Sequence, residues 1–151
     1  MENKQFKKLL GEIATKNGFE SAFGGWFKES PECIISLYLQ KSGYGNYYLL
    51  NIKIFIQKMF EKQYIKNKDL VSKYGGNVFR EPPKEYDPAL NLEILMEDLK
   101  RGQLLESMFN DFITPFTEKA LSKKGVLELA EEKKVFLLPA VKEELARLIE
   151  K

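Results

Sequence analysis

Two neighbouring segments with alternating apolar residues constrain the fold of this chain more than any other feature. Residues 33–40 and 47–56 place apolar side chains at every second position and are rich in β-branched and aromatic residues. This period of two is typical of half-buried antiparallel β-strands. The connection from Lys41 to Asn46 contains two glycines and suits a hairpin. The sequence therefore predicts a β-hairpin within an antiparallel sheet.

Apolar residues at helical spacing flank this hairpin on both sides. Residues 6–14 predict an N-terminal helix of about 14 residues, which Gly18 ends. A short strand is expected at 78–80, followed by a proline-rich loop. An apolar stripe at three- and four-residue steps then runs from Ile94 to Ile113 and predicts a helix.

Prolines and hydroxyl residues mark helix boundaries in the C-terminal part. Pro115 removes a backbone donor, so we expect the helix to kink or restart there, with Thr114 as a candidate N-cap. Ser122 is a candidate cap for a short helix. Pro139 suits the first turn of a terminal helix.

A helix, a hairpin-based sheet and then several helices do not follow the alternating order of a parallel α/β fold. We therefore predict an α+β fold in which an antiparallel sheet is built around the central hairpin. One face of this sheet is covered by the N-terminal helix and a C-terminal helical region. We expect a single domain over residues 1–151, with helix plus sheet in 1–90 and the helical part in 91–151.

Two residue counts restrict the chemistry that is open to this chain. It has no histidine and one cysteine, Cys33, among 151 residues. These counts exclude histidine-dependent nucleophilic pairs, histidine general bases, zinc sites built from histidine or several cysteines, and an internal disulfide. We therefore predict no cofactor, no metal ligands and no catalytic residues, and we favour binding over catalysis.

Charge is unevenly distributed along the chain, although the net charge is only +2. Residues 1–75 hold twelve lysines against seven acidic residues, whereas residues 76–151 hold twelve basic against fifteen acidic residues. Most of the basic residues are lysines, whereas phosphate recognition favours the fork of arginine. We therefore interpret the basic excess as a solvated surface. No apolar run resembles a signal-peptide core or a membrane span, so we expect a cytoplasmic protein without a membrane partner.

Seven residues are candidates for a binding surface. The hairpin connection and its flanks bring an amide, an ammonium, a hydroxyl and an aromatic ring to one sheet end, although the same residue types suit an ordinary turn. Trp26 follows two glycines and is either an interface anchor or part of the core. The candidates are Trp26, Gln40, Lys41, Ser42, Tyr44, Asn46 and Arg80.

The order of features between residues 5 and 56 resembles a known family. The opening helix ends in Asn17-Gly18-Phe19, a strand exits through Gln40-Lys41-Ser42, and Tyr47-Tyr48-Leu49-Leu50-Asn51-Ile52 follows the glycine loop. This pattern is similar to the bacterial domain-of-unknown-function family 4304. The resemblance implies a bacterial, single-domain α+β protein and implies no activity.

The leading functional hypothesis is a non-enzymatic module that binds another protein. The binding surface would be the sheet face or the 40–46 loop, and an immunity-type protein that neutralises a toxin is one concrete version. A weak nucleic-acid binder is one alternative, based on lysines interleaved with aromatic residues between 58 and 74. Acidic residues in that segment and the absence of a known motif disfavour it, so nucleic acid is not the expected partner.

An enzyme that uses carboxylates, with or without a divalent metal, is the other alternative. Glu93 and Glu97 would share one face of the predicted helix at i, i+4 spacing and could hold a hard cation. Glu97 also has Arg101 four residues further on, which predicts an ordinary surface ion pair. The carboxylates considered are Glu81, Glu85, Asp87, Glu93, Glu97 and Asp98.

Overall fold

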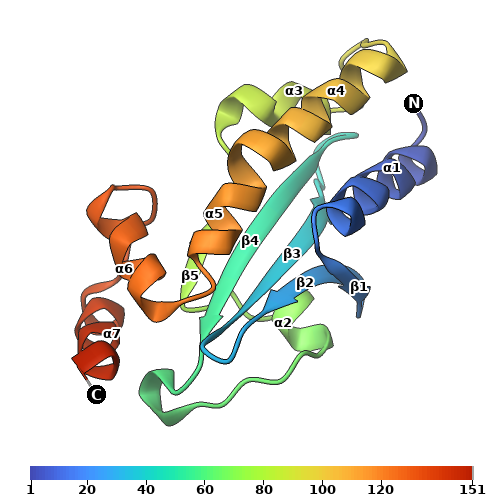
Figure 1. Cartoon of the computed structure of the whole chain (residues 1–151). Helices are drawn as coiled ribbons and strands as arrows, with labels where there is room; N and C mark the ends of the chain where they lie inside the picture. Colours follow the sequence, from blue (N-terminus) through green and yellow to red (C-terminus); the bar gives the residue numbers. More distant parts are fainter. Residues whose placement is uncertain (151) are drawn as a thin grey trace.

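The computed structural model describes residues 1–150 and has the predicted α+β architecture (Figure 1). The strands are β1 (Glu20–Ala22), β2 (Gly25–Glu29), β3 (Cys33–Lys41), β4 (Tyr48–Ile56) and β5 (Val78–Arg80). Within the described residues they form one sheet in the order β1-β2-β3-β4-β5, and every neighbouring pair is antiparallel. The sheet is therefore a simple meander.

Strands β3 and β4 form the predicted hairpin and the centre of the sheet. Their register runs from Cys33 opposite Ile56 to Lys41 opposite Tyr48. On one face, the alternating apolar residues of both strands are buried in the main hydrophobic core. These are the side chains that the sequence pattern predicted to be buried. Their removal from water stabilises the fold.

Helices other than α2 (Lys68–Ser72) cover this face of the sheet. The first is α1 (Asn3–Lys16), which ends just before Gly18, as predicted. The later helices on this side are α3 (Asp87–Leu90), α4 (Asp98–Met108), α5 (Thr114–Lys119), α6 (Lys123–Glu131) and α7 (Pro139–Glu150). Short helical turns are η1 (Met59–Glu61), η2 (Lys84–Tyr86) and η3 (Phe109–Ile113). In Figure 1, α1 and the long rod of α4 and α5 lie over the same face, whereas α6 and α7 extend past β5.

The prediction that the apolar stripe forms a helix from Ile94 onward is wrong at its start. Helix α4 begins at Asp98, and Ile94, Leu95 and Leu99 are exposed to solvent. The reason is tertiary, because the guanidinium of Arg101 donates hydrogen bonds to several backbone carbonyls before the helix. These carbonyls belong to Pro88, Ala89, Asn91 and Ile94. The bonds tie the end of α3 and the non-helical residues Asn91 and Ile94 to Arg101, which keeps the chain between α3 and α4 out of the helix.

The predicted surface ion pair between Glu97 and Arg101 is also wrong. Arg101 is only 2% exposed, and its charge is directed at backbone carbonyls. Glu97 is the residue that precedes α4 and has extended backbone angles. It therefore does not share a helix face with Glu93, and the predicted i, i+4 pair of carboxylates does not form.

An α-helix restarts at Pro115, as predicted, because α5 begins at Thr114 and has Pro115 in its first turn, but the helical rod continues without a break. The preceding residues, Phe109–Ile113, form a π-helix, and the carbonyl that Pro115 would otherwise contact lies inside it. Thr114 has helical backbone angles (φ −65°, ψ −52°), so it is not the N-cap that the sequence suggested. The other two boundary predictions are confirmed. The Ser122 hydroxyl accepts a hydrogen bond from the Gly125 N–H at 2.9 Å, and α7 begins at Pro139.

The opposite face of the sheet carries a small second core under α2. It consists of Phe27, Ile34, Phe55, Leu70 and Val71. Two polar side chains that lie opposite each other on β3 and β4 fix α2 to the sheet. The Ser36 hydroxyl donates to the Leu70 carbonyl at 2.8 Å, and the Lys53 ammonium donates to the Val71 carbonyl at 2.5 Å. Lys53 is consequently only 5% exposed.

Deprotonation of Lys53 is expected to stabilise the protein. Burial lowers the pKa of Lys53 below its ordinary value of 10.5, whereas the unfolded chain retains that ordinary value. Between these two pKa values the unfolded chain binds more protons than the native state, so the free energy of unfolding rises with pH. Urea denaturation measures the free energy of unfolding of the wild type and of Lys53→Met. We expect this free energy to rise with pH in the wild type relative to Lys53→Met, up to the pKa of the lysine in the unfolded chain. A difference that does not change with pH would contradict this expectation.

Candidate functional site

The hairpin connection is anchored to α1 and to the segment before α4 through Asn46. The Asn46 side-chain oxygen accepts a hydrogen bond from the Asn3 amide at 2.7 Å. The Asn46 N–H donates to the Glu93 carboxylate at 2.6 Å, and its carbonyl accepts from the Leu92 N–H at 3.0 Å. Asn46 therefore joins three segments at one end of the molecule.

Three other candidates of the hairpin connection lie at the same end. The Ser42 hydroxyl accepts a hydrogen bond from the Tyr44 N–H at 3.0 Å, as in an ordinary turn. The Tyr44 side chain is almost fully exposed. The Lys41 ammonium lies 5.9 Å from the centre of the Tyr48 ring. These residues form an exposed rim rather than a closed pocket.

The remaining candidates lie elsewhere, so the seven residues do not form one site. Gln40 lies on the opposite face of the sheet, where its side-chain oxygen accepts a hydrogen bond from Asn51 at 3.0 Å. Trp26 is half-buried on β2, and its indole packs against Gly11 of α1. Arg80 ends β5, on the side of the sheet away from β2.

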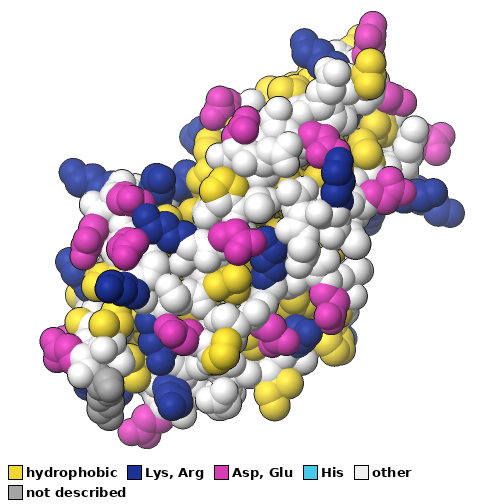
Figure 2. Space-filling model, in the orientation of Figure 1, with side chains coloured by type: hydrophobic (Ala, Val, Ile, Leu, Met, Phe, Trp, Pro, Cys, Tyr) yellow, Lys and Arg dark blue, Asp and Glu magenta, His cyan; other side chains and the backbone are white. Residues whose placement is uncertain are grey.

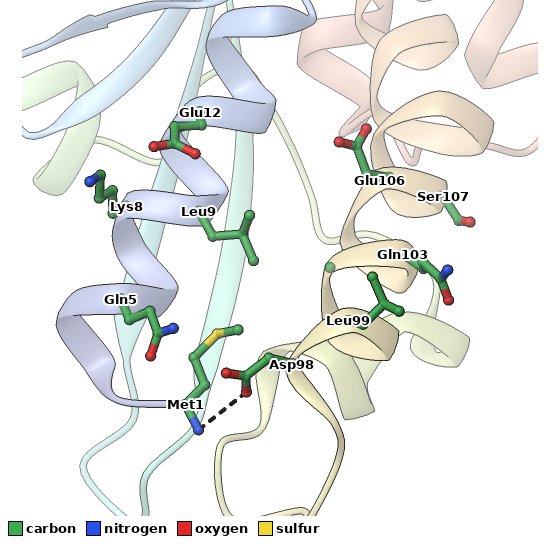
Figure 3. Close-up of a pocket in the computed structure, with 11 residues that line it drawn as sticks. Met1, Gln5, Lys8, Leu9, Glu12, Asp98, Leu99, Gln103, Glu106 and Ser107 are labelled. Carbon is green, nitrogen blue, oxygen red and sulfur yellow. Dashed lines mark ion pairs between the residues drawn. The ribbon is translucent and has the colours of Figure 1, made fainter.

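A groove lies between α1 and α4 (Figure 3). Its volume is about 900 Å³. Leu9 of α1 and Leu99 of α4 lie between the two helices and supply apolar walls. Gly102 leaves the α4 side of the floor open, because a Cβ at this position would meet only the Leu9 side chain, at 3.8 Å. The groove is therefore apolar at its centre and accessible from solvent.

Two ion pairs attach α4 to α1 and to the residue Met1 before it, one near each end of this groove. The Lys16 ammonium lies 3.3 Å from the Glu106 carboxylate. The Met1 nitrogen lies 3.6 Å from the Asp98 carboxylate, as the dashed line in Figure 3 shows. With a rise of 1.5 Å per residue, the part of α4 from Asp98 to Glu106 is about 12 Å long. The length of the groove therefore corresponds to about two turns of an α-helix.

Exposed apolar side chains continue from the groove onto the residues before α4. Leu99 is 74% exposed, Leu95 is fully exposed and Ile94 is partly exposed. Figure 2 shows apolar side chains at the surface over the start of α4. We call the groove together with Ile94 and Leu95 the α1–α4 surface. Adjoining exposed apolar side chains of this kind mark interaction sites on soluble proteins.

Replacing Gly102 with alanine is expected to raise the free energy of unfolding by about 0.5–1 kcal/mol. Glycine inside a helix loses more conformational freedom on folding than alanine does, and the added Cβ would make only an ordinary contact with Leu9. Urea denaturation followed by circular dichroism measures this change. A loss of stability would show that the floor of the groove cannot accept a methyl group.

The carboxylates considered from the sequence are not assembled into one ligand set. Glu93 binds the Asn46 N–H, and Asp98 faces Met1 at the end of the groove. Among residues 1–150, no three His, Cys, Asp or Glu side chains are placed to share a metal ion. Burial, with a smaller contribution from Glu32, raises the pKa of the Cys33 thiol to about 12, so this thiol stays protonated near neutral pH.

The lysine-rich segment after β4 is partly neutralised by acidic side chains. The Lys66 ammonium pairs with Glu20 at 3.1 Å and with Glu29 at 3.2 Å. Phe60 and Tyr74 are partly exposed, whereas the Tyr64 ring packs against Phe55 of the second core. The aromatic residues of this segment therefore do not form one continuous stacking surface.

Sequence reasoning missed the α1–α4 surface because it placed Leu99 on the inner stripe of a helix. The one local signal was Gly102, a glycine within a helical segment. The glycine marks the floor of a groove only because Leu9, which is far away in the sequence, lies opposite it.

Comparisons with known proteins identify the family of this chain. A family model described as "Domain of unknown function (DUF4304)" matches residues 10–119, which extend from α1 to the end of α5. No curated protein and no solved structure matches the chain. Within the described residues, no helix has both the length and the apolar character that crossing a bilayer requires.

Proposed function

The chain belongs to the DUF4304 family, and from this premise we propose that it is a non-enzymatic module that binds another protein through the α1–α4 surface. The observation that carries the proposal is an apolar groove with exposed leucines along its edge. An immunity-type protein that neutralises a toxin is one concrete version of this function. A bacterial, cytoplasmic setting belongs to the same proposal, and a single buried cysteine is compatible with a reducing compartment.

The groove favours an amphipathic helix of the partner as its occupant. Two helices form its walls, and its length matches about two helical turns, which suits apolar anchors at i, i+3 or i+4, and i+7. The structure is less suited to an extended peptide that would pair with an edge strand of the sheet. The edge strands β1 and β5 are each three residues long and offer few free backbone groups.

The charges along the groove indicate which charged residues the partner helix should carry beside its apolar stripe. The α4 wall carries the carboxylates of Asp98 and Glu106, which remain 55% and 35% exposed beside their ion pairs. The α1 wall carries Lys8 and Glu12, which have opposite charges. A partner helix with lysine or arginine on the side that faces α4 would complement the acidic wall.

Fluorescence anisotropy with a labelled helical peptide of about three turns tests the proposal. The peptide has a leucine stripe with lysine flanks, and a second peptide has the same stripe with glutamate flanks. We expect saturable micromolar binding of the lysine-flanked peptide and binding at least about tenfold weaker for the glutamate-flanked one. Equal binding of both peptides, or no binding of either, would refute the proposed occupant.

Variants of the protein locate the binding site. Leu99→Asp places a charge in the groove and Gly102→Phe fills it, so each should weaken binding at least about tenfold. Ile65→Asp is the matched control, because Ile65 is 76% exposed, close to the 74% of Leu99, and lies outside the groove. Undiminished binding by Leu99→Asp would show that the peptide binds elsewhere.

A further inference from the structure

A second cleft lies between β5 and the connection from α6 to α7, far from the start of α4 (Figure 1). Its volume is about 600 Å³. Four of its lining side chains are cationic, and none of the lining residues is acidic; the cations are Arg80, Lys133, Lys134 and Lys142. Two exposed aromatic rings, Phe79 and Phe136, also line the cleft. We call it the β5–α7 cleft.

The Arg80 guanidinium is fixed in this cleft without a carboxylate. It stacks over the rings of Phe112 and Phe116, at 4.6 Å and 5.8 Å from their centres. Its Nε donates to the Glu81 carbonyl at 3.1 Å, and its Nη1 donates to the Lys134 carbonyl. Within the described chain, Nη2 has no hydrogen bond and no acidic side chain pairs with this guanidinium. The charge is therefore pre-positioned and not neutralised.

The lysines of the cleft are also poorly compensated. Lys133 and Lys142 make no ion pair within residues 1–150. Lys134 approaches the Glu132 carboxylate at 3.7 Å, but that carboxylate lies closer to Lys119, at 3.1 Å. Four cations around one cleft repel each other, and a bound anion would relieve this repulsion.

We propose that the β5–α7 cleft binds a nucleoside phosphate. The phosphate oxygens contact Arg80 and the neighbouring lysines, and the base lies against Phe79 or Phe136. A volume of about 600 Å³ lies within the range of small-ligand pockets and is large enough for a single nucleotide. Lys133, Lys134, Phe136 and Lys142 lie outside the residues 10–119 that match the family, whereas Phe79 and Arg80 lie within them, so the cleft joins the matched part of the chain to its C-terminal part. It is independent of the proposed protein-binding groove.

Calorimetric titration with ADP, adenosine and pyrophosphate at low ionic strength tests this proposal. We expect ADP to bind at least about tenfold more tightly than either fragment, because only ADP engages both the cations and the rings. Added salt should weaken ADP binding, because the phosphate contacts are electrostatic. Pyrophosphate binding as tight as that of ADP would overturn the role of the rings. Binding of a single-stranded oligonucleotide without binding of ADP would overturn the proposal in favour of a polymer.

Exposed residues of the cleft provide variants that should keep the fold, which thermal melting verifies. Lys142→Glu should weaken ADP binding at least about tenfold, whereas Lys124→Glu, the same charge change at an exposed site outside the cleft, should alter it less than about twofold. Phe136→Ser should weaken ADP binding about fivefold or more and leave pyrophosphate binding unchanged. Equal effects of Lys142→Glu and Lys124→Glu would show that the overall charge, and not this cleft, attracts the ligand.

Discussion

Replacing Arg101 with alanine is expected to lower the free energy of unfolding by about 4 kcal/mol. The Arg101 guanidinium is buried and donates four hydrogen bonds of 2.8–3.1 Å to the backbone between Pro88 and Ile94. Alanine would leave these carbonyls without their donor and would remove the packed arginine stem. The segment that leads from α3 into α4 would then lose its main attachment to the helix.

Urea denaturation followed by circular dichroism measures this loss. Arg101→Lys should also destabilise, by about 2 kcal/mol or more, because an ammonium cannot reproduce the planar fork that reaches four carbonyls. Arg147→Ala is the control, because Arg147 is 47% exposed and pairs with Glu144 at the surface. It should cost less than about 1 kcal/mol. If Arg101→Ala costs no more than this control, the hydrogen bonds of Arg101 do not hold the segment.

Replacing Gly125 with alanine is expected to lower the free energy of unfolding by about 3 kcal/mol. Gly125 lies in the first turn of α6, and a Cβ there would overlap the Lys119 carbonyl oxygen at the end of α5. It would also lie 2.9 Å from the Ser122 hydroxyl that caps α6. The close approach of α6 to the end of α5 therefore requires a residue without a side chain.

Gly102→Ala is the matched control for Gly125→Ala, because both substitutions replace a helical glycine by alanine. The two changes should have opposite signs, since Gly102 has room for a methyl group and Gly125 does not. Thermal unfolding of both variants beside the wild type gives the comparison. A stabilised Gly125→Ala variant would mean that α5 and α6 can separate at little cost.

Features that depend on residues close together in the sequence were predicted well. The hairpin is one example, because the alternation in Cys33–Lys41 and Tyr48–Ile56 and the short connection between them already define the pairing. Ser122 and Pro139 are others, since a cap or a first-turn proline acts within one helical turn. The restart of the helix at Pro115 was also predicted, but Thr114 was misjudged as its cap, because a π-helix leads directly into α5.

The candidate site could be predicted only in part. Asn46 and Tyr44 were recognised as residues of an exposed loop, but the partners of Asn46 come from α1 and from the segment before α4. The contact with Asn3 spans 43 positions in the sequence, and that with Glu93 spans 47. No local pattern encodes such distant pairs.

The sequence by itself determined the α+β class, the central hairpin and the absence of histidine chemistry, because these follow from local periodicity and residue counts. Only the tertiary structure decided that Arg101 is buried, that Leu99 faces an open groove and that four cations of different segments share one cleft. A side chain's burial and its charged neighbours depend on which distant segments pack beside it. The same arginine or leucine can therefore be a surface residue or a key contact.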